Sequence, residues 1–331
     1  MTPTAVLVTG SSGYLGRLLV AELASRARAG RLGAVIAADI REPDSVPEGA
    51  TFVRHDVRDE GLDAVLRRHR IAVVVHLASI VTPPKGSTRA FGYAVDVGGT
   101  QRVLEACVAA GVRRVVVTSS GAAYGYHADN PAWLRESDPV RGNETFAYSW
   151  HKRLVEERLA TYRRDHPELE QVIFRVGTIL GETVNNQITA LFERRRLLAI
   201  RGSDSPFVFV HDRDVVGCLV RAVDSPVTGI FNVAGDGALT IDEIAALLGK
   251  PVLRIPAWLL QGALAVLKPL GLSRYGPEQV DFLRYRPVLD NARLKREFGY
   301  VPASTSREAF LRWRDARRRA AALSGRPSTR H

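Results

Sequence analysis

Short apolar runs alternate with longer amphipathic segments over the first two-thirds of the chain. The runs are rich in β-branched residues, and the segments between them carry apolar residues at three- and four-residue spacing, as helices do. The predicted strands are residues 5–9, 34–38, 51–54, 72–77, 114–118 and 171–175, and the predicted helices are residues 15–28, 61–69, 100–110 and 147–164. This alternation predicts an α/β fold with a doubly wound parallel sheet, which binds ligands beyond the carboxyl ends of its strands.

The pattern becomes less regular after residue 175. Here it predicts strands at 207–210 and 229–233 and helices at 214–223, 240–248, 258–267, 290–298 and 306–319. Thr240 and Glu243 form a capping box for the second helix, and the strongly apolar third helix is expected to be packed. We expect a Rossmann domain of residues 1–175 plus about 205–236, a small interleaved substrate domain of about 176–204 plus 237–315, and a basic tail at 316–331.

Composition excludes several classes of protein. No apolar run approaches the roughly 20 residues of a membrane-spanning helix, and residues 1–4 do not resemble a signal peptide, so we expect a cytoplasmic protein with no membrane partner. Cys107 and Cys218 are predicted to be buried thiols, with no metal site. The net charge of +11 comes mostly from dispersed arginines. Its one cluster, residues 312–319, is expected to be solvated, so no nucleic-acid partner is predicted.

A glycine-rich turn, Gly10-Ser11-Ser12-Gly13-Tyr14-Leu15-Gly16, lies between the first predicted strand and helix. Glycines there allow a tight turn and bring backbone N–H groups and the start of a helix close to a pyrophosphate. The turn therefore predicts a dinucleotide site. Its candidate cofactor residues are Gly10, Ser12, Gly13, Tyr14, Leu15 and Gly16.

Acidic residues at the ends of the next two strands bear on the choice of cofactor. Asp39 ends the second strand, where a carboxylate binds the adenosine ribose hydroxyls and repels a 2′-phosphate, which favours NAD. Arg41, two residues later, is able to meet a phosphate instead, so NADP remains open. Asp56, with Val57 beside it, is placed to contact the adenine. A helix-cap role for one of these aspartates is an equal alternative.

Tyr148 is the one tyrosine of nine with a lysine, Lys152, four residues later. On a helix these positions share a face, so the phenol and the ammonium group converge. A fixed cation stabilises a phenolate, which makes the tyrosine a usable acid and base. Ser119 and Ser120 follow the fifth strand, at the same sheet edge as the glycine-rich turn. A serine hydroxyl there is able to hold the oxygen of an alcohol or ketone, although such a pair more often forms a turn.

The chain resembles the extended short-chain dehydrogenases/reductases, also called the NAD-dependent epimerase/dehydratase family, over about residues 4–300. The motifs that carry the resemblance are residues 9–16, His76-Leu77-Ala78-Ser79, residues 118–125, Tyr148-Ser149-Trp150-His151-Lys152, Phe174-Arg175-Val176, residues 210–215 and residues 295–300. The resemblance implies that Ser120 is the catalytic serine, Tyr148 the acid and base, and Lys152 the residue that stabilises the phenolate and binds the nicotinamide ribose.

The same resemblance implies further site residues and a homodimer. The nicotinamide is expected near Leu77, Ala78, Ser79, Thr118, Val176 and Thr178. Substrate contacts are expected from Val81, Gly121, Tyr124 and Asn186. Three segments, residues 80–89, 183–188 and 258–275, are expected to shape the substrate pocket.

Three departures from the family pattern narrow the function. Asp96 stands where many members have an asparagine. Gly121-Ala122 stands where the dehydratases of this family carry an Asp-Glu pair. Without these acids the substrate cannot lose water, so 4,6-dehydration is not expected. No arginine occurs in residues 205–209, where nucleotide-sugar epimerases usually carry one for the diphosphate, although Arg201 or Arg286 could compensate. We therefore expect reversible oxidation of a secondary alcohol of a small-molecule substrate with NAD. The alternatives are a nucleotide-sugar 4-epimerase and a non-catalytic cofactor-sensing protein.

Overall fold

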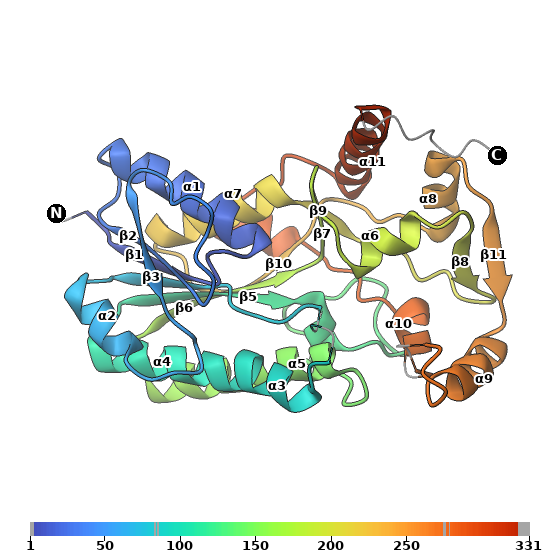
Figure 1. Cartoon of the computed structure of the whole chain (residues 1–331), viewed down its shortest axis with the longest axis horizontal. Coiled ribbons are helices and arrows are strands. Elements are labelled where there is room, and N and C mark those ends of the chain that lie inside the picture. Colours follow the sequence, from blue (N-terminus) through green and yellow to red (C-terminus); the bar gives the residue numbers. More distant parts are fainter. Residues whose placement is uncertain (1–2, 83, 85, 274–275, 278, 324–331) are drawn as a thin grey trace.

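A seven-stranded parallel sheet runs through the protein, in a computed structural model that describes residues 3–82, 84, 86–273, 276–277 and 279–323 (Figure 1). Its strand order is β10-β6-β5-β4-β1-β2-β3. The strands are β1 (Val6–Thr9), β2 (Val35–Asp39), β3 (Ala50–Arg54), β4 (Val73–His76), β5 (Arg114–Ser120), β6 (Glu170–Val176) and β10 (Gly229–Val233). All seven were predicted within two residues at each end, because apolar runs rich in β-branched residues are typical of buried parallel strands. The edge strand β3 is less buried than the others, with Thr51 and Arg54 exposed.

Helices cover both faces of this sheet, which confirms the predicted doubly wound α/β fold (Figure 1). One face packs against α1 (Tyr14–Arg28), α7 (Asp212–Asp224) and the π-helical turn η3 (Leu294–Phe298). The other face packs against α2 (Leu62–Arg68), α4 (Gly99–Ala110) and α5 (Ala147–Asp165). A short helix, α3 (Arg89–Tyr93), leads through the π-helical turn η1 (Ala94–Gly98) into α4.

A second cluster of elements extends from the carboxyl ends of the sheet. Two short parallel pairs form there, β7 with β9 and β8 with β11. Their bounds are β7 (Thr178–Leu180), β8 (Leu197–Ile200), β9 (Phe209–His211) and β11 (Val252–Ile255), and the helices around them are α6 (Gln187–Phe192), α8 (Ile241–Leu248), α9 (Ala257–Leu267), α10 (Gln279–Arg284) and α11 (Ser306–Leu323). A separate aromatic core holds this cluster together, with Phe192, Phe209 and Trp313 at its centre.

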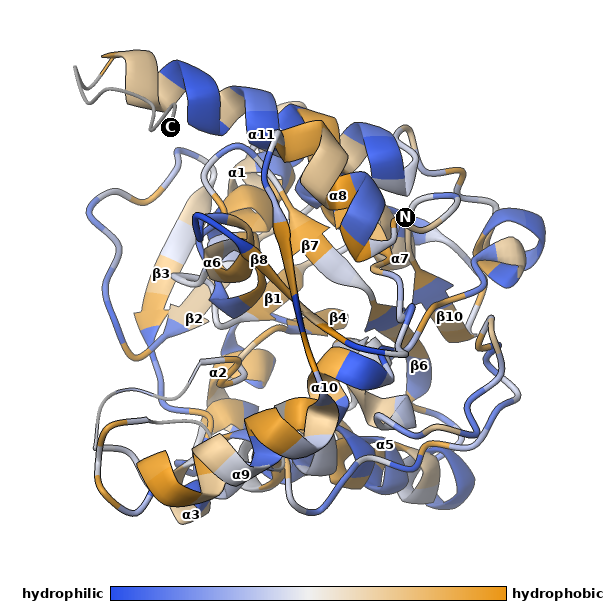
Figure 2. Ribbon diagram, turned by 90° about the vertical axis from the view of Figure 1, so that its right-hand side faces the viewer, coloured by the Kyte–Doolittle hydropathy of each residue, from blue (hydrophilic) through white to orange (hydrophobic). Residues whose placement is uncertain are grey.

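Of the predictions for the helices of this second half, one is confirmed and one is wrong. The capping box of α8 is present, with Thr240 Oγ1 accepting from the Glu243 N–H. Helix α9 forms where it was expected, but the prediction that it is packed is wrong, because none of its residues is buried and Trp258 is 72% exposed. Figure 2 shows its apolar ribbon next to α10. The domain limits remain a prediction, and the expected tail begins within α11, with residues 324–331 outside the described part.

The two cysteines are buried and free, as predicted, and burial raises the pKa of the Cys107 thiol to about 12. Among the described residues, no group of histidine, cysteine and acidic side chains is arranged to hold a metal ion. None of the described helices is long and apolar enough to cross a membrane.

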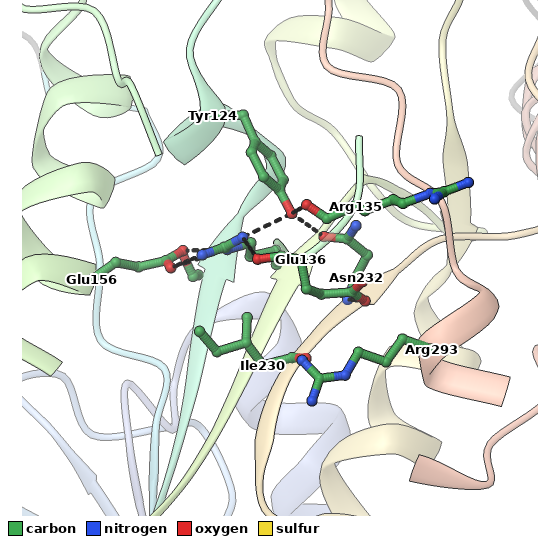
Figure 3. Close-up of polar contacts among 9 residues, drawn as sticks. Tyr124, Arg135, Glu136, Glu156, Ile230, Asn232 and Arg293 are labelled. Atoms are coloured by element: carbon green, nitrogen blue, oxygen red, sulfur yellow. Dashed lines mark hydrogen bonds and ion pairs between the residues drawn. The ribbon is translucent and has the colours of Figure 1, made fainter. Parts of the chain in front are cut away.

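A buried ion pair joins α5 to the sheet. The Arg175 guanidinium on β6 donates to both carboxylate oxygens of Glu156, with a shortest distance of 2.6 Å, and Ser119 Oγ donates to the same carboxylate at 2.6 Å. Burial opposes the charge of Arg175, yet Glu156 keeps the pKa of Arg175 above its ordinary value. Figure 3 shows that Tyr124 and Asn232 continue the network toward the second half of the chain.

Replacing Glu156 by glutamine is expected to lower the free energy of unfolding by about 3–5 kcal/mol, because it leaves the buried guanidinium of Arg175 without a countercharge. The measurement is urea unfolding followed by circular dichroism. The matched control is Glu157→Gln on the same helix, where the exposed pair with Arg153 is worth at most about 0.5 kcal/mol. Equal losses in the two variants would contradict this role for Glu156.

Candidate active site

A cavity of about 660 Å³ opens at the carboxyl ends of β1, β4, β5 and β6. It extends from the glycine-rich turn, past β5 and α5, to β7, α6 and α10. Of the predicted site residues, those on its wall are Gly10, Gly13, Tyr14, Leu15, Gly16, Leu77, Ser79, Val81, Thr118, Ser120, Gly121, Tyr148, Lys152, Val176, Thr178 and Asn186. The position of this cavity is the one expected for a ligand of a doubly wound sheet.

The glycine-rich turn has the shape of a phosphate cradle. Gly10 has a φ of +68°, and a Cβ on it would lie 2.6 Å from the backbone N of Ala78. A Cβ on Gly16 would collide with the backbone of Gly10 and Ser11, so both positions require glycine. Within the described structure, no side chain caps the N-terminus of α1 and its first turn holds no acidic residue. These free N–H groups fit a pyrophosphate.

Asp39 is bound to this turn. One carboxylate oxygen accepts from the Ser12 N–H at 3.0 Å and the other from the Arg41 N–H at 3.0 Å, while Ser12 Oγ donates to the Arg41 carbonyl at 2.6 Å. The contacts fix the end of β2 against the turn. A carboxylate accepts up to about four hydrogen bonds, so Asp39 keeps capacity for two ribose hydroxyls.

Asp56 is engaged elsewhere. Arg58 grips its carboxylate with two side-chain nitrogens and also donates its backbone N–H at 2.9 Å, and these bonds hold the pKa of Asp56 below its ordinary value. Neither Asp56 nor Val57 lines the cavity, since Val57 is buried and packs against Gly99. The helix-cap role that was an open alternative does not apply to Asp56, because the residue that caps α2 is Gly61, and adenine contact by Asp56 and Val57 remains a prediction.

Tyr14 spans from α1 to α7. Its hydroxyl donates to Asp212 Oδ2 at 2.5 Å, and burial together with this carboxylate raises the pKa of Tyr14. The tyrosine thus joins the glycine-rich turn to the strand–helix corner after β9. This contact connects residues 198 positions apart and could not be read from the motif.

The catalytic candidates come together on β5 and α5. Ser119 and Ser120 both line the cavity, but the Ser119 hydroxyl donates to the buried Glu156 carboxylate, whereas Ser120 Oγ accepts from the Ala122 N–H at 3.1 Å. Tyr148 is half-buried on the same wall. The buried Lys152 Nζ donates to the Thr118 carbonyl at 3.1 Å and lies 5.7 Å from the centre of the Tyr148 ring. A cation is therefore fixed beside the phenol, as the i, i+4 spacing predicts.

Sequence reasoning missed the role of His76, which links the ends of β1 and β4 to α4. Its Nδ1 lies 2.8 Å from Thr9 Oγ1 and its Nε2 lies 3.1 Å from Thr100 Oγ1. Thr100 donates its hydroxyl hydrogen to the Asp96 carbonyl, so Nε2 must donate and Nδ1 must accept. Burial and the nearby charge of Lys152 lower the pKa of His76 to about 4, so the ring is neutral at pH 7.

Asp96 also has a definite position in the structure. It is buried, and Oδ1 accepts from Ser79 Oγ at 2.9 Å and from the Ile80 N–H at 2.8 Å. Oδ2 accepts from Nδ1 of His151, at 3.1 Å, and His151 lies next to Lys152 on α5. Asp96 therefore fixes the loop after β4 to the helix that carries Tyr148 and Lys152.

The four predicted substrate residues divide into two groups. Val81, Gly121 and Asn186 line the cavity, although Asn186 Oδ1 caps α6 by accepting from the Ile188 and Thr189 N–H groups. Tyr124 does not fit the prediction. It is fully buried behind β5, and its hydroxyl is occupied by Arg175, Asn232 Oδ1 and the Arg135 carbonyl (Figure 3). The sequence could not show this burial, because the partners of the Tyr124 hydroxyl come from segments that are distant along the chain.

The expected pocket-shaping segments also divide. Residues 183–188 all line the cavity, and so do Val81 and Thr82 of the 80–89 segment. None of the described residues of the 258–275 segment does so, because α9 lies beyond α10, which supplies Phe282 instead. Residues 274 and 275 lie outside the described part. Ala78 is likewise absent from the wall and contributes its backbone, close behind Gly10.

Replacing Asp96 by asparagine is expected to cost about 1.5–3 kcal/mol at pH 7, because it removes charge-assisted hydrogen bonds. Burial favours the protonated acid, but the bonds from His151, Ile80 and Ser79 and the charge of Lys152 hold the pKa of Asp96 below its ordinary value. Such a group stabilises the fold above the unfolded pKa and stops doing so as the pH falls through the folded one.

The wild-type protein should therefore lose more stability between pH 5 and pH 3, roughly the range of carboxyl titration, than Asp96→Asn does. Urea unfolding across this range measures the difference, with Asp44→Asn at an exposed position as the control. Parallel stability curves for wild type and Asp96→Asn would show that Asp96 is not held ionised by these contacts.

Comparisons with known proteins agree with this geometry. A model of the NAD dependent epimerase/dehydratase family matches residues 6–234. An uncharacterised protein of Mycobacterium tuberculosis is 28% identical over 313 residues, which cover 93% of this chain and 82% of that protein. Sterol demethylase protein B of Methylococcus capsulatus is 30% identical over 338 residues, covering 92% of this chain and 95% of the relative.

A solved structure of similar fold is the UDP-glucose 4-epimerase of Thermus thermophilus in complex with NAD. It has a TM-score of 0.70 and is 25% identical, and the match covers 95% of this chain and 99% of the epimerase. The family match spans the glycine-rich turn, Ser120 and the Tyr148–Lys152 pair, and the prediction of NAD as the cofactor is confirmed at the level of the family. The chain belongs to the NAD dependent epimerase/dehydratase family.

Proposed function

We propose that this protein is an NAD-dependent dehydrogenase that oxidises a secondary alcohol of a largely apolar substrate to a ketone. The observation that carries the proposal is the cavity wall beyond Tyr148. Its side chains are mostly apolar and aromatic, including Phe146, Val184, Ile188, Phe207, Val208 and Phe282. A wall of this kind suits a hydrocarbon skeleton with few polar groups.

The polar groups of the cavity supply the chemistry. Tyr148 takes the hydroxyl proton of the substrate, and Ser120 holds the same oxygen by a hydrogen bond. Lys152 stabilises the phenolate form of Tyr148 and, in our proposal, also binds the nicotinamide ribose. Bound NAD⁺ would supply the acceptor for the hydride of the carbinol carbon. In the reverse direction Tyr148 returns the proton to the carbonyl oxygen.

Two further lines support a dehydrogenase over the other reactions of the family. Gly121 and Ala122 follow Ser120, so the acids that 4,6-dehydration needs are absent from these positions. The Methylococcus relative is named for sterol demethylation, and a sterol is an apolar skeleton with a secondary alcohol. We therefore propose sterol-like alcohols as the substrate class.

A second candidate, nucleotide-sugar 4-epimerisation, is favoured by Arg286. This side chain is partly buried on the cavity wall, lies with its guanidinium carbon 3.7 Å from the centre of the Phe207 ring, and donates to the Ser205 carbonyl at 2.7 Å. Among the described residues its Nε has no hydrogen-bond partner, and burial lowers the pKa of Arg286 to about 9. An anionic group of a substrate would satisfy this cation. The two candidates differ in readout, since only the dehydrogenase releases NADH.

Replacing Tyr148 by phenylalanine is expected to lower turnover by about 10²–10⁴-fold, because the variant cannot move the proton. The readout is NADH absorbance with a 3-hydroxysteroid substrate, and fluorescence titration should show that NAD binding is retained. Tyr162→Phe is the matched control, since Tyr162 lies on the same helix and contacts Gln101 outside the cavity. Unchanged turnover in Tyr148→Phe would refute the mechanism, and activity on UDP-galactose without NADH release would favour the epimerase.

A further inference from the structure

An apolar patch without a cover lies at the end of the molecule that holds α9. Its residues, Trp258, Leu259, Val266, Leu267, Leu270 and Leu272, form the α9 patch. Trp258 and Leu272 are 72% and 73% exposed, and the other four are between 36% and 64% exposed. None of the residues of α9 is buried. A group of exposed large apolar side chains on one helix and the turn after it is typical of a site that binds another apolar surface.

The segment that carries the patch is basic. Residues 244–277 contain no aspartate or glutamate and four basic residues, so this segment carries a formal charge of +4. Arg254 pairs with Asp242 just outside the segment. Lys268 follows Leu267 and is exposed at the surface. The whole chain carries +11. Two copies that met through this patch would bring like charges together. An anionic lipid surface would instead attract the basic segment and accept the apolar side chains.

The length of α9 determines how it would bind a lipid bilayer. Helix α9 has 11 residues, and at about 1.5 Å per residue it is roughly half as long as the hydrocarbon core of a bilayer is thick. It is therefore too short to span. A short helix with exposed tryptophan and leucine side chains and flanking cations is suited to lie in the interface between headgroups and acyl chains.

The patch also lies beside the cavity. Helix α9 contacts α10, and Phe282 of α10 lines the cavity wall. Both views show α9 and α10 next to each other, and in Figure 1 they lie at the opposite end of the molecule from the N-terminus. Val81, another wall residue, is 57% exposed.

We propose that the α9 patch docks this protein on an anionic lipid surface, with the patch side chains in the interface and the basic residues near the headgroups. This proposal revises the expectation from the sequence that the protein has no membrane partner. Seated in this way, the cavity wall at α10 faces the membrane from which an apolar substrate is taken up. The docking stands on the exposed patch and its charge alone, whereas the uptake of substrate rests on the proposed function.

The test is co-sedimentation of the full chain with vesicles of phosphatidylcholine, alone or mixed with phosphatidylglycerol. We expect binding to the anionic vesicles that weakens with salt. The double variant Trp258→Ser/Leu272→Ser should bind at least about tenfold more weakly, since burial of each side chain is worth about a factor of ten or more. The matched control, Trp133→Ser/Val301→Ser, changes two residues that are 45% and 68% exposed outside the patch and should bind like the wild type.

A second readout locates the contact. Brominated lipid should quench part of the tryptophan fluorescence of the wild type, and that part should vanish in Trp258→Phe. Binding that is absent, or that is equal in the patch and control variants, would overturn the proposal. So would a concentration-dependent dimer in sedimentation velocity that the patch variant abolishes. Steroid turnover measured without vesicles separates the two proposals, because a failure there removes the dehydrogenase and leaves the vesicle result standing.

Discussion

Two buried carboxylates hold α5 in place, and their contacts with the helix lie on either side of Lys152. Asp96 accepts from His151, the residue before Lys152, and Glu156, one turn further on, binds Arg175 and Ser119. Asp96 connects the helix to the loop after β4, and Glu156 connects it to the neighbouring strands β5 and β6. The helix can therefore neither slide nor rotate without leaving a buried charge unpaired, which costs several kcal/mol. This constraint fixes where Tyr148 and Lys152 meet the end of β5.

The cofactor side of the site depends on the same contacts. Asp96 also binds Ser79 and the Ile80 N–H, while the neutral His76 ties the ends of β1 and β4 together. The glycine-rich turn is held in turn by Asp39 and by the close backbone of Ala78. Hydrogen bonds and close backbone contacts thus connect the glycine-rich turn, the loop after β4 and α5, which fits the proposed role in hydride transfer, where small misplacements are costly.

Local features of the sequence predicted most of this unit. Buried strands, the glycine-rich turn and the Tyr148–Lys152 spacing are short-range signals, and they remain visible without a partner segment. Contacts between distant segments were not predictable in the same way. The Asp96–His151 pair spans 55 positions, and Tyr124 looked like a substrate residue until its buried partners on β6 and β10 were known. Helix α9 illustrates a further limit, because an apolar helix reads alike whether the fold covers it or leaves it exposed.

We propose that NAD lies along the cavity with its nicotinamide between Ser120, Tyr148 and Lys152. A crystal structure of the protein with NAD is the decisive measurement. We expect the pyrophosphate at the N-terminus of α1, the adenosine ribose hydroxyls on Asp39, the nicotinamide ribose on Lys152 and the ring facing the Tyr148 hydroxyl. A dinucleotide bound elsewhere, for example in the groove between α1 and α7 that Glu22 and Arg221 line, or one with its nicotinamide turned away from Tyr148, would contradict it.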